Sequence, residues 1–344
     1  MKQSHEERTA AEPRATALHT VTIGKIHEIN HQIRIIRLEL SKEEGSGINF
    51  LAGQFLDVFC PGIEKAGGFT VTSPPSRAQR SSSAAPPYLE LAVQKSPENP
   101  AAAYLWQGRP TSTSNEDSDE EQDADESSAH RQQQPGIVGT QLQVRIGGSF
   151  VYPPSGIASA SHVLRRVVFV AGGMGVNPLV SMAAHMAEED RGEDGPEVWF
   201  LYSVRAPGGK GRREGADGML FLNRLADLFA RDSLRGKLQL FLTPAAAENG
   251  DDGERGEVLQ TYTDMNGNEV QADGVVSCNE VDVPFQQRRI TKVDLVEAIG
   301  PEPKKAVVYV CGVPTMTDEM VQYLTDKDAG IGLDTDRVKF EKWW

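Results

Sequence analysis

The segment AGGMGVNP at residues 171–178 is the part of the sequence best suited to bind a nucleotide. It lies between a continuous apolar run and a helical repeat of apolar residues, which places its glycines at a strand-to-helix turn. Because glycine has no Cβ, the backbone at such a turn can approach a ligand closely. The start of the following helix offers free N–H groups and a partial positive charge to a pyrophosphate. The candidate dinucleotide-binding residues are Gly172, Gly173, Met174, Gly175, Asn177 and Pro178.

Asn177 and Pro178 are residue types that are typical of a helix start. Asn is a favoured N-cap, and Pro costs nothing in the first helical position because its missing N–H would be unbonded there. The segment is not a Walker A loop, and Pro178 takes the place of the third glycine in GxGxxG. A turn that only packs a helix on its strand is therefore the alternative interpretation.

A second turn of this kind, CGVPTM at residues 311–316, also follows an apolar run and precedes a helical repeat. In a doubly wound sheet, ligands bind at the carboxyl ends of the strands where the strand order reverses. We therefore expect the two turns to face the same ligand. Cys311 would contact the reacting ring, although a small buried apolar residue is the commoner role of a free cysteine. The candidate residues of this turn are Cys311, Gly312, Pro314 and Met316.

The elements that position these turns alternate between strand and helix from residue 163 onward. Four apolar runs have the length of strands: RVVFVAG (166–172), VWFLYS (198–203), LQLFL (238–242) and AVVYVCG (306–312). Continuous apolar runs are typical of parallel strands buried on both faces. The alternation predicts a doubly wound parallel-sheet α/β domain over residues 163–344, interrupted by a loop insertion at 244–275.

Residues 20–155 show a different pattern, in which short β-rich segments are separated by turns. The six segments are VTIGKIHEI (21–29), IRIIRLEL (33–40), QFLDVFC (54–60), GGFTVTS (67–73), YLELAVQ (88–94) and TQLQVRI (140–146). They predict a small six-stranded antiparallel β-barrel. Residues 1–19 are expected to be a disordered tail. Residues 108–135, rich in acidic, Ser/Thr and Gln residues, are expected to be an insertion with no core of its own.

The charge and composition of the 344-residue chain exclude several classes of function. Acidic residues outnumber basic residues 49 to 35, for a net charge of −14, whereas binding nucleic acid requires a basic face. No apolar run approaches the roughly 20 residues of a membrane-spanning helix. Three cysteines cannot form a disulfide framework, and the seven histidines lack metal-ligand spacing. We therefore expect an intracellular protein with no metal site, no membrane span and no nucleic-acid partner.

The order of these features resembles that of the ferredoxin–NADP reductase family: a six-stranded β-domain, then AGGMGVNP, then CGVPTM. More narrowly, GGFTVTSPP and the terminal FEKWW are similar to the oxidoreductase NAD-binding domain-containing protein branch. The resemblance covers about residues 20–344 apart from the two insertions. It implies an FAD-binding FR-type β-barrel over residues 20–155, followed by an NAD(P)-binding domain.

The flavin signature of that family, Arg-x-Tyr-Ser/Thr-x-x-Ser, falls on residues 67–73 of this chain. The resemblance implies that the Thr70 hydroxyl bonds near flavin N5 and that the Phe69 ring packs on the isoalloxazine; packing alone is the alternative for Phe69. Gly67 stands where the family has the Arg that pairs with the flavin pyrophosphate, so a charge-assisted contact is missing. The implied flavin-binding residues are Phe69, Thr70, Val71, Thr72 and Ser73.

The second phosphate-binding element of the family, Gly-x-x-Ser-x-Tyr-Leu, falls on residues 99–105, where the serine is absent. With Asn99 as its cap, this segment can still start a helix whose N–H groups hold phosphate. Lys95 would compensate for the missing arginine. The residues implied at the flavin phosphates are Lys95, Asn99, Ala101 and Ala102. FAD is the expected flavin, and FMN is the less expected one.

Two further pairs of residues bear on the dinucleotide. Glu341 and Trp343 resemble the acidic and aromatic residues with which family members often close beside the flavin, although an apolar anchor for the last strand is an equal alternative. After the second apolar run, Ser203 and Arg205 favour NADPH, since an Arg can bind its 2′-phosphate. The name of the branch favours NADH, and the choice between the two stays open.

The function implied by the resemblance is a flavin-dependent NAD(P)H oxidoreductase in which Thr70, Cys311 and Glu341 are catalytic. It would pass hydride from NAD(P)H to FAD, and then electrons to an unidentified acceptor that is a small molecule or a separate redox protein. The alternative is a non-catalytic NAD(P)-binding sensor or scaffold that has lost its flavin. The resemblance implies a mitochondrial location, whereas the N-terminal sequence does not resemble a transit peptide and favours the cytosol.

Overall fold

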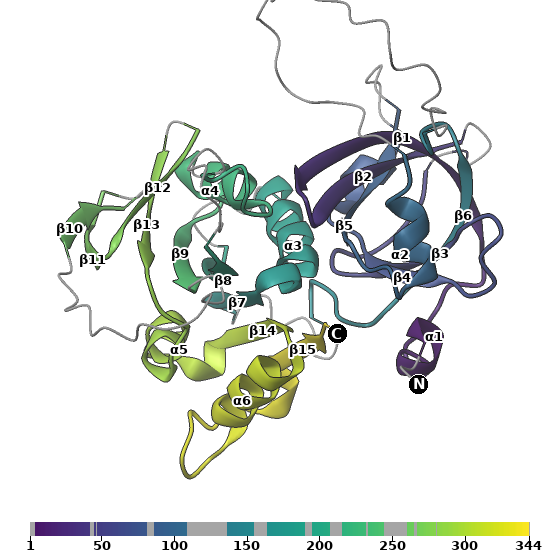
Figure 1. Ribbon diagram of the computed structural model, residues 1–344. Coiled ribbons are helices and arrows are strands. Elements are labelled where there is room, and N and C mark those ends of the chain that lie inside the picture. The colour runs from purple at the N-terminus through teal and green to yellow at the C-terminus, as the bar shows by residue number, and fades with distance from the viewer. Residues whose placement is uncertain are drawn as a thin grey trace, which may run out of the picture. The chain divides into compact units, whose positions relative to one another are not determined.

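The computed structural model (Figure 1) contains two compact units. The first comprises Met1–Asn49, Leu56–Phe69 and Arg77–Gly147, and the second comprises Phe50–Phe55, Thr70–Ser76 and Gly148–Trp344. The described residues are 4–343 without 42–44, 46, 81–85, 109–135, 155–163, 190–194, 207–214, 232, 244–259, 265–266 and 280. The predicted acidic insertion lies outside the described residues from residue 109 onward, as does the first half of the predicted loop insertion and Trp344.

The β-rich N-terminal segments form one six-stranded sheet in the order β4-β3-β6-β1-β2-β5. Its strands are β1 (His19–Asn30), β2 (Ile33–Leu40), β3 (Phe55–Phe59), β4 (Gly67–Thr70), β5 (Tyr88–Gln94) and β6 (Gln141–Gly147). The pairings of β1 with β2, β1 with β6 and β2 with β5 are antiparallel. Along β2 buried and partly exposed residues alternate strictly, as expected for a strand with one face on a core. The prediction of six antiparallel strands is therefore confirmed.

One helix follows β5 in this unit. Helix α2 (Pro100–Leu105) begins at an Asn99 N-cap, whose side chain accepts a hydrogen bond from the Ala102 N–H, and has a proline in its first turn. Ala101 and Ala102 are buried, so the helix packs through its small residues. The helix start predicted at this position is therefore present.

The N-terminal segment, expected to be a disordered tail, is instead attached to the first unit. A short helix, α1 (His5–Arg8), starts with a capping box made by Ser4 and Glu7. Arg14 forms a β-bridge with Gly147. The segment is polar and carries no apolar stripe, so hydrophobic patterning could not reveal that it docks.

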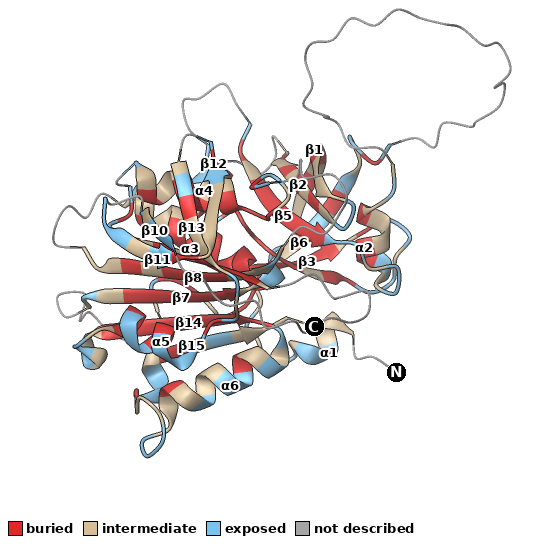
Figure 2. Cartoon of the chain, turned by 60° about the vertical axis from the view of Figure 1, so that its left-hand side comes forward, coloured by how far each residue is buried: buried red, intermediate tan, exposed pale blue. Residues whose placement is uncertain are grey.

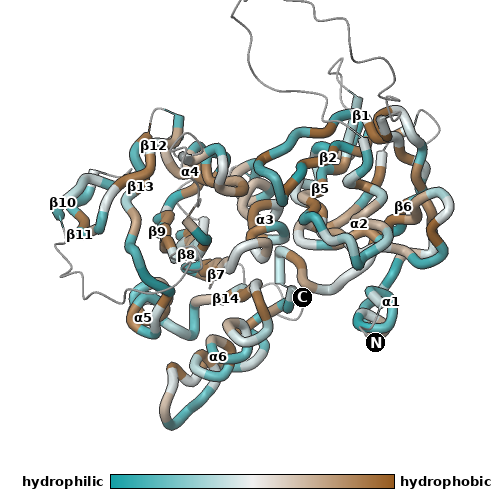
Figure 3. Tube along the Cα trace, viewed as in Figure 1, coloured by the Kyte–Doolittle hydropathy of each residue, from teal (hydrophilic) through white to brown (hydrophobic). Residues whose placement is uncertain are grey.

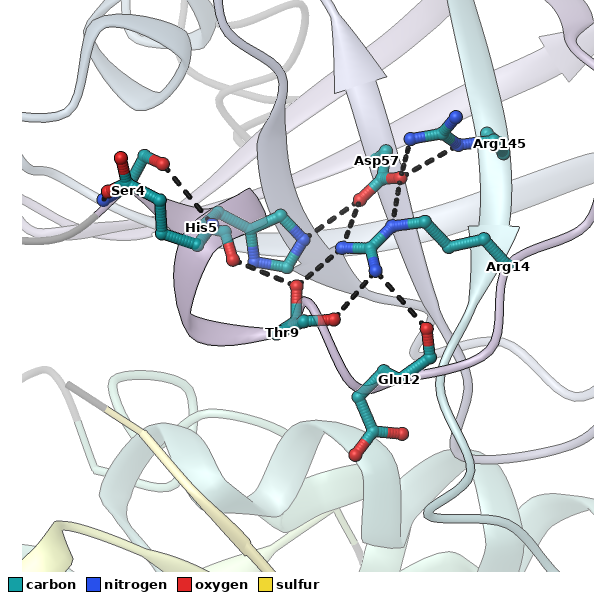
Figure 4. A network of polar contacts seen from close by, with 8 residues as sticks. Ser4, His5, Thr9, Glu12, Arg14, Asp57 and Arg145 are labelled. Carbon is teal, nitrogen blue, oxygen red and sulfur yellow. Dashed lines mark hydrogen bonds and ion pairs between the residues drawn. The ribbon is translucent and has the colours of Figure 1, made fainter.

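The docking depends on Asp57, a fully buried carboxylate on β3 (Figure 4). His5 Nε2 lies 2.9 Å from Asp57 Oδ1, Arg14 Nε donates to Oδ2 at 2.8 Å, and Arg145 Nη2 donates to Oδ2 at 2.7 Å. Burial raises the pKa of Asp57, but the hydrogen bonds from His5, Arg14 and Arg145 lower it further, to far below its ordinary value. A buried charge needs such partners, and the N-terminal segment supplies two of the three.

The second unit contains a seven-stranded sheet in the order β12-β13-β9-β8-β7-β14-β15. Its strands are β7 (Arg166–Gly172), β8 (Glu197–Arg205), β9 (Gly236–Thr243), β12 (Gly274–Cys278), β13 (Val281–Gln286), β14 (Ala306–Gly312) and β15 (Val338–Lys342). Strands β13, β9, β8, β7, β14 and β15 pair in parallel, and only β12 runs antiparallel to its neighbour. The prediction of a doubly wound parallel sheet is confirmed.

Helices cover both faces of this sheet. They are α3 (Val176–Glu188), α4 (Leu222–Ala230), α5 (Lys292–Ile299) and α6 (Pro314–Thr325). Helices α3 and α4 lie on one face and α5 and α6 on the other (Figure 1). On the α5–α6 face, Leu295 and Leu324 pack with Val168 and Val308 in one buried cluster. Figure 2 shows the result: β7, β8 and β14 are buried along most of their length.

The strand order reverses between β7 and β14. From β7 the chain adds β8 and then β9 on one side, and later returns to place β14 and β15 on the other side. Such a reversal directs the connections after the two central strands to opposite faces, which opens a binding position at their carboxyl ends. The fold therefore defines where a nucleotide would bind before any side chain is considered.

Part of the predicted loop insertion at 244–275 is regular structure. Strands β10 (Gln260–Thr263) and β11 (Glu269–Ala272) form an antiparallel hairpin, and β12 begins at Gly274. The high content of glycine and acidic residues in this stretch masked its short strands in the sequence. The insertion therefore ends in a hairpin that leads into the sheet.

Hydrophobic residues gather in the strands of the seven-stranded sheet, as Figure 3 shows for β7 and β9. The helices, in contrast, carry polar residues on one side, so they are surface helices of a globular domain. Within the described part of the chain, no helix has the length and apolar character needed to cross a membrane.

We expect Asp57→Asn to lower the free energy of unfolding at pH 7 by about 3 kcal/mol, because the change leaves Arg14 and Arg145 without their carboxylate. The pKa of Asp57 is lower in the folded chain than the value of about 3.9 in the unfolded chain, so its charge stabilises the fold above about pH 4. That contribution is lost as the pH falls further. Urea unfolding between pH 3 and pH 7 measures both effects.

The matched control is Glu64→Gln, which removes an exposed carboxylate from the same unit. It is expected to change stability by less than about 0.5 kcal/mol. An Asp57→Asn variant that unfolds like the original chain at every pH would contradict the role of the buried cluster.

Candidate functional site

The two glycine-bearing turns lie directly against each other. The first follows β7 and the second follows β14, which are neighbouring parallel strands with Ala171 opposite Cys311. A Cβ added to Gly175 would overlap the backbone carbonyl of Cys311. The side chain of Met316 covers the contact, because its Sδ would lie 2.6 Å from a Cβ on Gly172 and 3.2 Å from one on Gly312. Glycine is thus required at 175, where a Cβ would meet backbone, whereas at 172 the flexible Met316 side chain would have to shift.

Gly173 has the opposite surroundings. Its φ is +53°, and a Cβ at this residue would meet no atom within 4 Å. The residue is exposed and lies in a 3₁₀ turn, Gly173–Gly175, between β7 and α3. The backbone is therefore accessible at this point, next to the start of a 13-residue helix. This is the arrangement that a pyrophosphate requires.

The start of α3 differs from the prediction at Asn177 and Pro178. The helix begins at Val176 and its N-cap is Gly175, so Asn177 is the second helical residue and Pro178 the third. The physical reason is the 3₁₀ turn, which continues into the helix through bonds from the Val176 N–H to the carbonyls of Gly173 and Met174. Asn177 is fully buried in this turn and does not act as the cap.

The last strand brings the chain's C-terminal residues to the same place. Strand β15 pairs with β14 so that Glu341 lies opposite Cys311 and Lys342 opposite Gly312. Beyond the strand, the Trp343 N–H donates to the Gly312 carbonyl at 2.9 Å. The structure therefore gathers Cys311, Glu341 and Trp343 at the carboxyl end of β14, beside the first glycine turn.

The environment of Cys311 keeps its thiol neutral. The side chain is fully buried, and burial raises the pKa of the thiol well above its ordinary value. The negative charge of Glu341 raises this pKa further, while the Trp343 side chain lowers it in part. A thiolate is needed for nucleophilic attack or metal binding, so burial and a raised pKa disfavour both roles for Cys311. No cluster of three or more His, Cys, Asp or Glu residues that suits a metal ion occurs in the described ranges.

Ser203 and Arg205 lie at the carboxyl end of β8. Ser203 is opposite Gly172 of β7, so it borders the first glycine turn. Arg205 is opposite Thr243 of β9 and is exposed. Arg205 is thus an exposed cation two residues beyond Ser203.

The second half of the flavin signature belongs to the same compact unit as the glycine turns. The Ser181 hydroxyl of α3 donates to the Ser73 carbonyl at 2.8 Å, and Ser76 donates to Glu188 at 2.6 Å. Arg224 of α4 donates to the Thr72 carbonyl at 3.4 Å. These hydrogen bonds hold the segment after β4 against α3 and α4. Sequence reasoning missed Ser181, whose signal is a polar residue within the apolar face of α3.

Thr70 carries the one buried polar atom of the signature that lacks a partner. Its side chain is 1 % exposed, and its hydroxyl makes no hydrogen bond to any described residue. Leaving a buried hydroxyl without a partner costs about 1–3 kcal/mol. Val71 and Thr72 beside it are fully buried. A ligand with an acceptor or donor at this position, such as the ring system of a flavin, would satisfy Thr70.

The phosphate end of the flavin signature does not suit FAD. A Cβ on Gly67 would lie 2.5 Å from the Cβ of Ala101 and 2.7 Å from Cε2 of Phe69, so α2 and the Phe69 ring fill the space of an arginine side chain. Phe69 is itself buried. Lys95, the expected substitute for the arginine, has its Nζ over the Trp106 ring at 5.4 Å from the centroid. The unpartnered Thr70 hydroxyl thus suits a polar group of a flavin ring, whereas the filled space at Gly67 does not fit the FAD diphosphate.

We expect Gly175→Ala to weaken NAD(P)H binding at least tenfold and to lower stability, because its Cβ would force the two turns apart. Calorimetric titration with NADH and NADPH, together with urea unfolding, measures both effects. Gly136→Ala is the control, since a Cβ there meets no atom within 4 Å. Unchanged dinucleotide binding in Gly175→Ala would show that the contact between the turns is not part of the site.

Comparison with known proteins identifies relatives along the whole chain. No protein-family model matches it. The chain is 25% identical over 343 residues to the Danio rerio protein called Oxidoreductase NAD-binding domain-containing protein 1, covering 100% of this chain and 98% of that protein. The Homo sapiens protein of the same name is 25% identical over 350 residues, covering 100% and 85%. The reductase component of propane 2-monooxygenase from Rhodococcus jostii is 23% identical over 309 residues, covering 90% and 60%.

Solved structures share the two-part architecture. A ferredoxin NADP+ reductase from Neisseria gonorrhoeae with bound FAD and NADP has a TM-score of 0.54 at 13% identity, covering 96% of this chain and 100% of that one. The Amycolatopsis cytochrome P450 reductase GcoB has a TM-score of 0.56 at 17% identity, covering 96% and 70%. These findings confirm the resemblance: the chain is similar over its full length to proteins called Oxidoreductase NAD-binding domain-containing protein 1, and its fold is that of ferredoxin–NADP reductase-like FAD/NAD-binding reductases.

Proposed function

We propose that the protein is an NAD(P)H-dependent oxidoreductase whose nicotinamide binds at the carboxyl ends of β7 and β14. The observation that carries this proposal is the packing of two glycine turns at the point where the strand order reverses, with Glu341 and Trp343 brought beside Cys311. A turn that only packs a helix would not need the exposed, left-handed Gly173. The reductase names of the relatives support the same activity.

Each residue of the site has a physical task in this proposal. The backbone at Gly173 and the start of α3 bind the pyrophosphate. The neutral Cys311 side chain forms an apolar wall for the nicotinamide, and Glu341 and Trp343 border the same position. Excluding water here protects the transferred hydride from competing reactions. These residues orient the dinucleotide, and orientation is the main contribution of the protein to such a reaction.

The hydride acceptor in this proposal is a flavin whose ring is held at Thr70. A bound flavin supplies the chemistry of accepting hydride from NAD(P)H and passing electrons onward to a small molecule or a separate redox protein. The unpartnered Thr70 hydroxyl supports this part of the proposal. The closed region around Gly67 favours the alternative, a non-catalytic NAD(P)-binding sensor or scaffold.

Anaerobic mixing of the protein with flavin and either NADH or NADPH tests the activity. We expect the flavin absorbance to bleach at a rate that depends on protein concentration. Thr70→Val is expected to slow bleaching at least tenfold with an unchanged Kd for the dinucleotide, because it removes only the hydroxyl. Thr317→Val makes the same change at another buried, unpartnered hydroxyl and is the control. Dinucleotide binding without any bleaching would establish the sensor or scaffold instead.

We expect Arg205→Leu to raise the Kd for NADPH at least tenfold and to leave the Kd for NADH within threefold, because only NADPH has a 2′-phosphate for the guanidinium to bind. Parallel titrations of both dinucleotides measure the ratio. Arg231→Leu, which removes an exposed cation from the end of α4, is the control. Equal changes in the Kd values for NADPH and NADH would show that Arg205 does not bind the 2′-phosphate.

A further inference from the structure

The position of Gly67 leaves no room for an anion. Strand β4 and helix α2 approach until a Cβ on Gly67 would lie 2.5 Å from the Cβ of Ala101. The Phe69 ring closes the same space from the strand itself, with its Cε2 2.7 Å from that position. A diphosphate placed here would displace an apolar contact and find no charge in return.

Two of the first three N–H groups of helix α2 are already bonded, so its start is a poor replacement for the missing arginine. Pro100 lacks an N–H, and the Ala102 N–H is bonded to the Asn99 side chain at 3.3 Å. The Ala103 N–H is bonded to the Asn99 carbonyl at 2.8 Å. Ala101 and Ala102 are also buried, so the first turn is covered.

The nearby cations are placed at the wrong end of α2. Trp106 is the C-cap of this helix, and Lys95 Nζ lies over its ring. The Arg34 guanidinium lies over the same ring at 4.3 Å and is paired with Glu28 at 3.1 Å. Both charges therefore sit at the helix C-terminus, where they interact favourably with the last carbonyls, and not at Asn99. Arg34 also donates to the Trp106 carbonyl at 3.1 Å, which fixes this arrangement.

On the other side of β4, the chain is closed by its own N-terminal segment. A Cβ on Gly68 would overlap the imidazole of His5, which is held by Asp57 at 2.9 Å. The two further cations of that cluster, Arg14 and Arg145, are bound to the same carboxylate. His5, Arg14 and Arg145 are thus all engaged by Asp57 on this side of β4.

We infer that this chain binds flavin through the isoalloxazine ring alone, as an exchangeable ligand, and gains nothing from the ribityl phosphate or the diphosphate. Riboflavin, FMN and FAD share the ring and differ only in this tail, so they would bind with nearly equal affinity. The inference rests on the proposed function, since it concerns the flavin of the same site. It assigns Gly67 and Ala101 as the residues that remove any preference of the chain among riboflavin, FMN and FAD.

Equilibrium dialysis of the full chain with riboflavin, FMN and FAD, at 0.05 and 0.5 M NaCl, tests the inference. We expect three Kd values within threefold of one another and less than a twofold change with salt, because charge pairing to a phosphate is screened by salt and ring contacts are not. FAD or FMN binding at least tenfold more tightly than riboflavin would overturn it. Absence of riboflavin binding at millimolar concentration would overturn it as well.

The same samples separate this inference from the proposed function. NADH and NADPH binding, followed by calorimetry, depends on the glycine turns and is unaffected by the flavin tail. A strong preference for FAD with intact dinucleotide binding and bleaching would refute ring-only binding and leave the oxidoreductase standing. Loss of dinucleotide binding would refute the oxidoreductase directly.

A gain-of-function variant tests the two residues named. Gly67→Arg combined with Ala101→Gly removes the Ala101 Cβ and supplies a guanidinium, which enters the space once the Phe69 ring turns aside. This variant is expected to bind FMN and FAD at least tenfold more tightly than riboflavin. Gly67→Gln with Ala101→Gly is the matched control, which opens the same space without a charge and is expected to show no preference. If the arginine variant does not fold, the Kd comparison on the original chain still decides the question. Equal affinities in a folded arginine variant would show that this position does not face the phosphates.

Discussion

The contact between Gly175 and the backbone of Cys311 is the constraint on which the second unit depends. Strands β7 and β14 pair in parallel up to Cys311, so the turns that follow them begin at the same level of the sheet. Both turns can occupy that level only if one of them lacks a Cβ at the crossing point, and Gly175 meets this condition. The two backbones therefore lie in contact at the carboxyl ends of β7 and β14, directly before the start of α3.

The last strand extends the same arrangement toward the chain's end. Because β15 continues the parallel order beside β14, Glu341 is placed level with Cys311 without any loop. The hydrogen bond from the Trp343 N–H to the Gly312 carbonyl extends the pairing of β15 with β14 by one residue beyond the end of β15. Burial and the neighbouring Glu341 carboxylate raise the pKa of the Cys311 thiol, which favours its uncharged form.

Most of this framework could be predicted from the sequence, for physical reasons. A strand buried on both faces must be apolar throughout, so β7 and β14 are visible as continuous runs, and glycines after such runs mark the site. The start of α3 could not be placed correctly, since Asn177 and Pro178 are good starting residues but the preceding glycines form a 3₁₀ turn that begins the helix earlier. Hydrogen-bond geometry decides that boundary, and residue types do not report it.

The attachment of the N-terminal segment was hidden for a different reason. A polar segment signals docking only through its partners, and Asp57 is surrounded by apolar residues that do not mark it as a charged centre. Motif comparison likewise showed that an arginine is missing at Gly67, but not that Ala101 has moved into its space. The absence of the arginine does not by itself show whether another cation replaces it. The contact of Gly67 with Ala101 and Phe69 shows that apolar groups fill this space.

The two halves of the segment that matches the flavin signature differ in how their residues are satisfied. A buried threonine hydroxyl without a partner costs free energy, and a valine of the same shape would avoid that cost. Gly67, Ala101 and Phe69 satisfy each other through apolar contact, so they need no ligand to be stable. Packing alone therefore accounts for the phosphate end of the signature, whereas the proposed flavin ring gives the Thr70 hydroxyl a partner. The segment from Thr70 to Ser76 is held by hydrogen bonds to helices of the same unit as the first glycine turn.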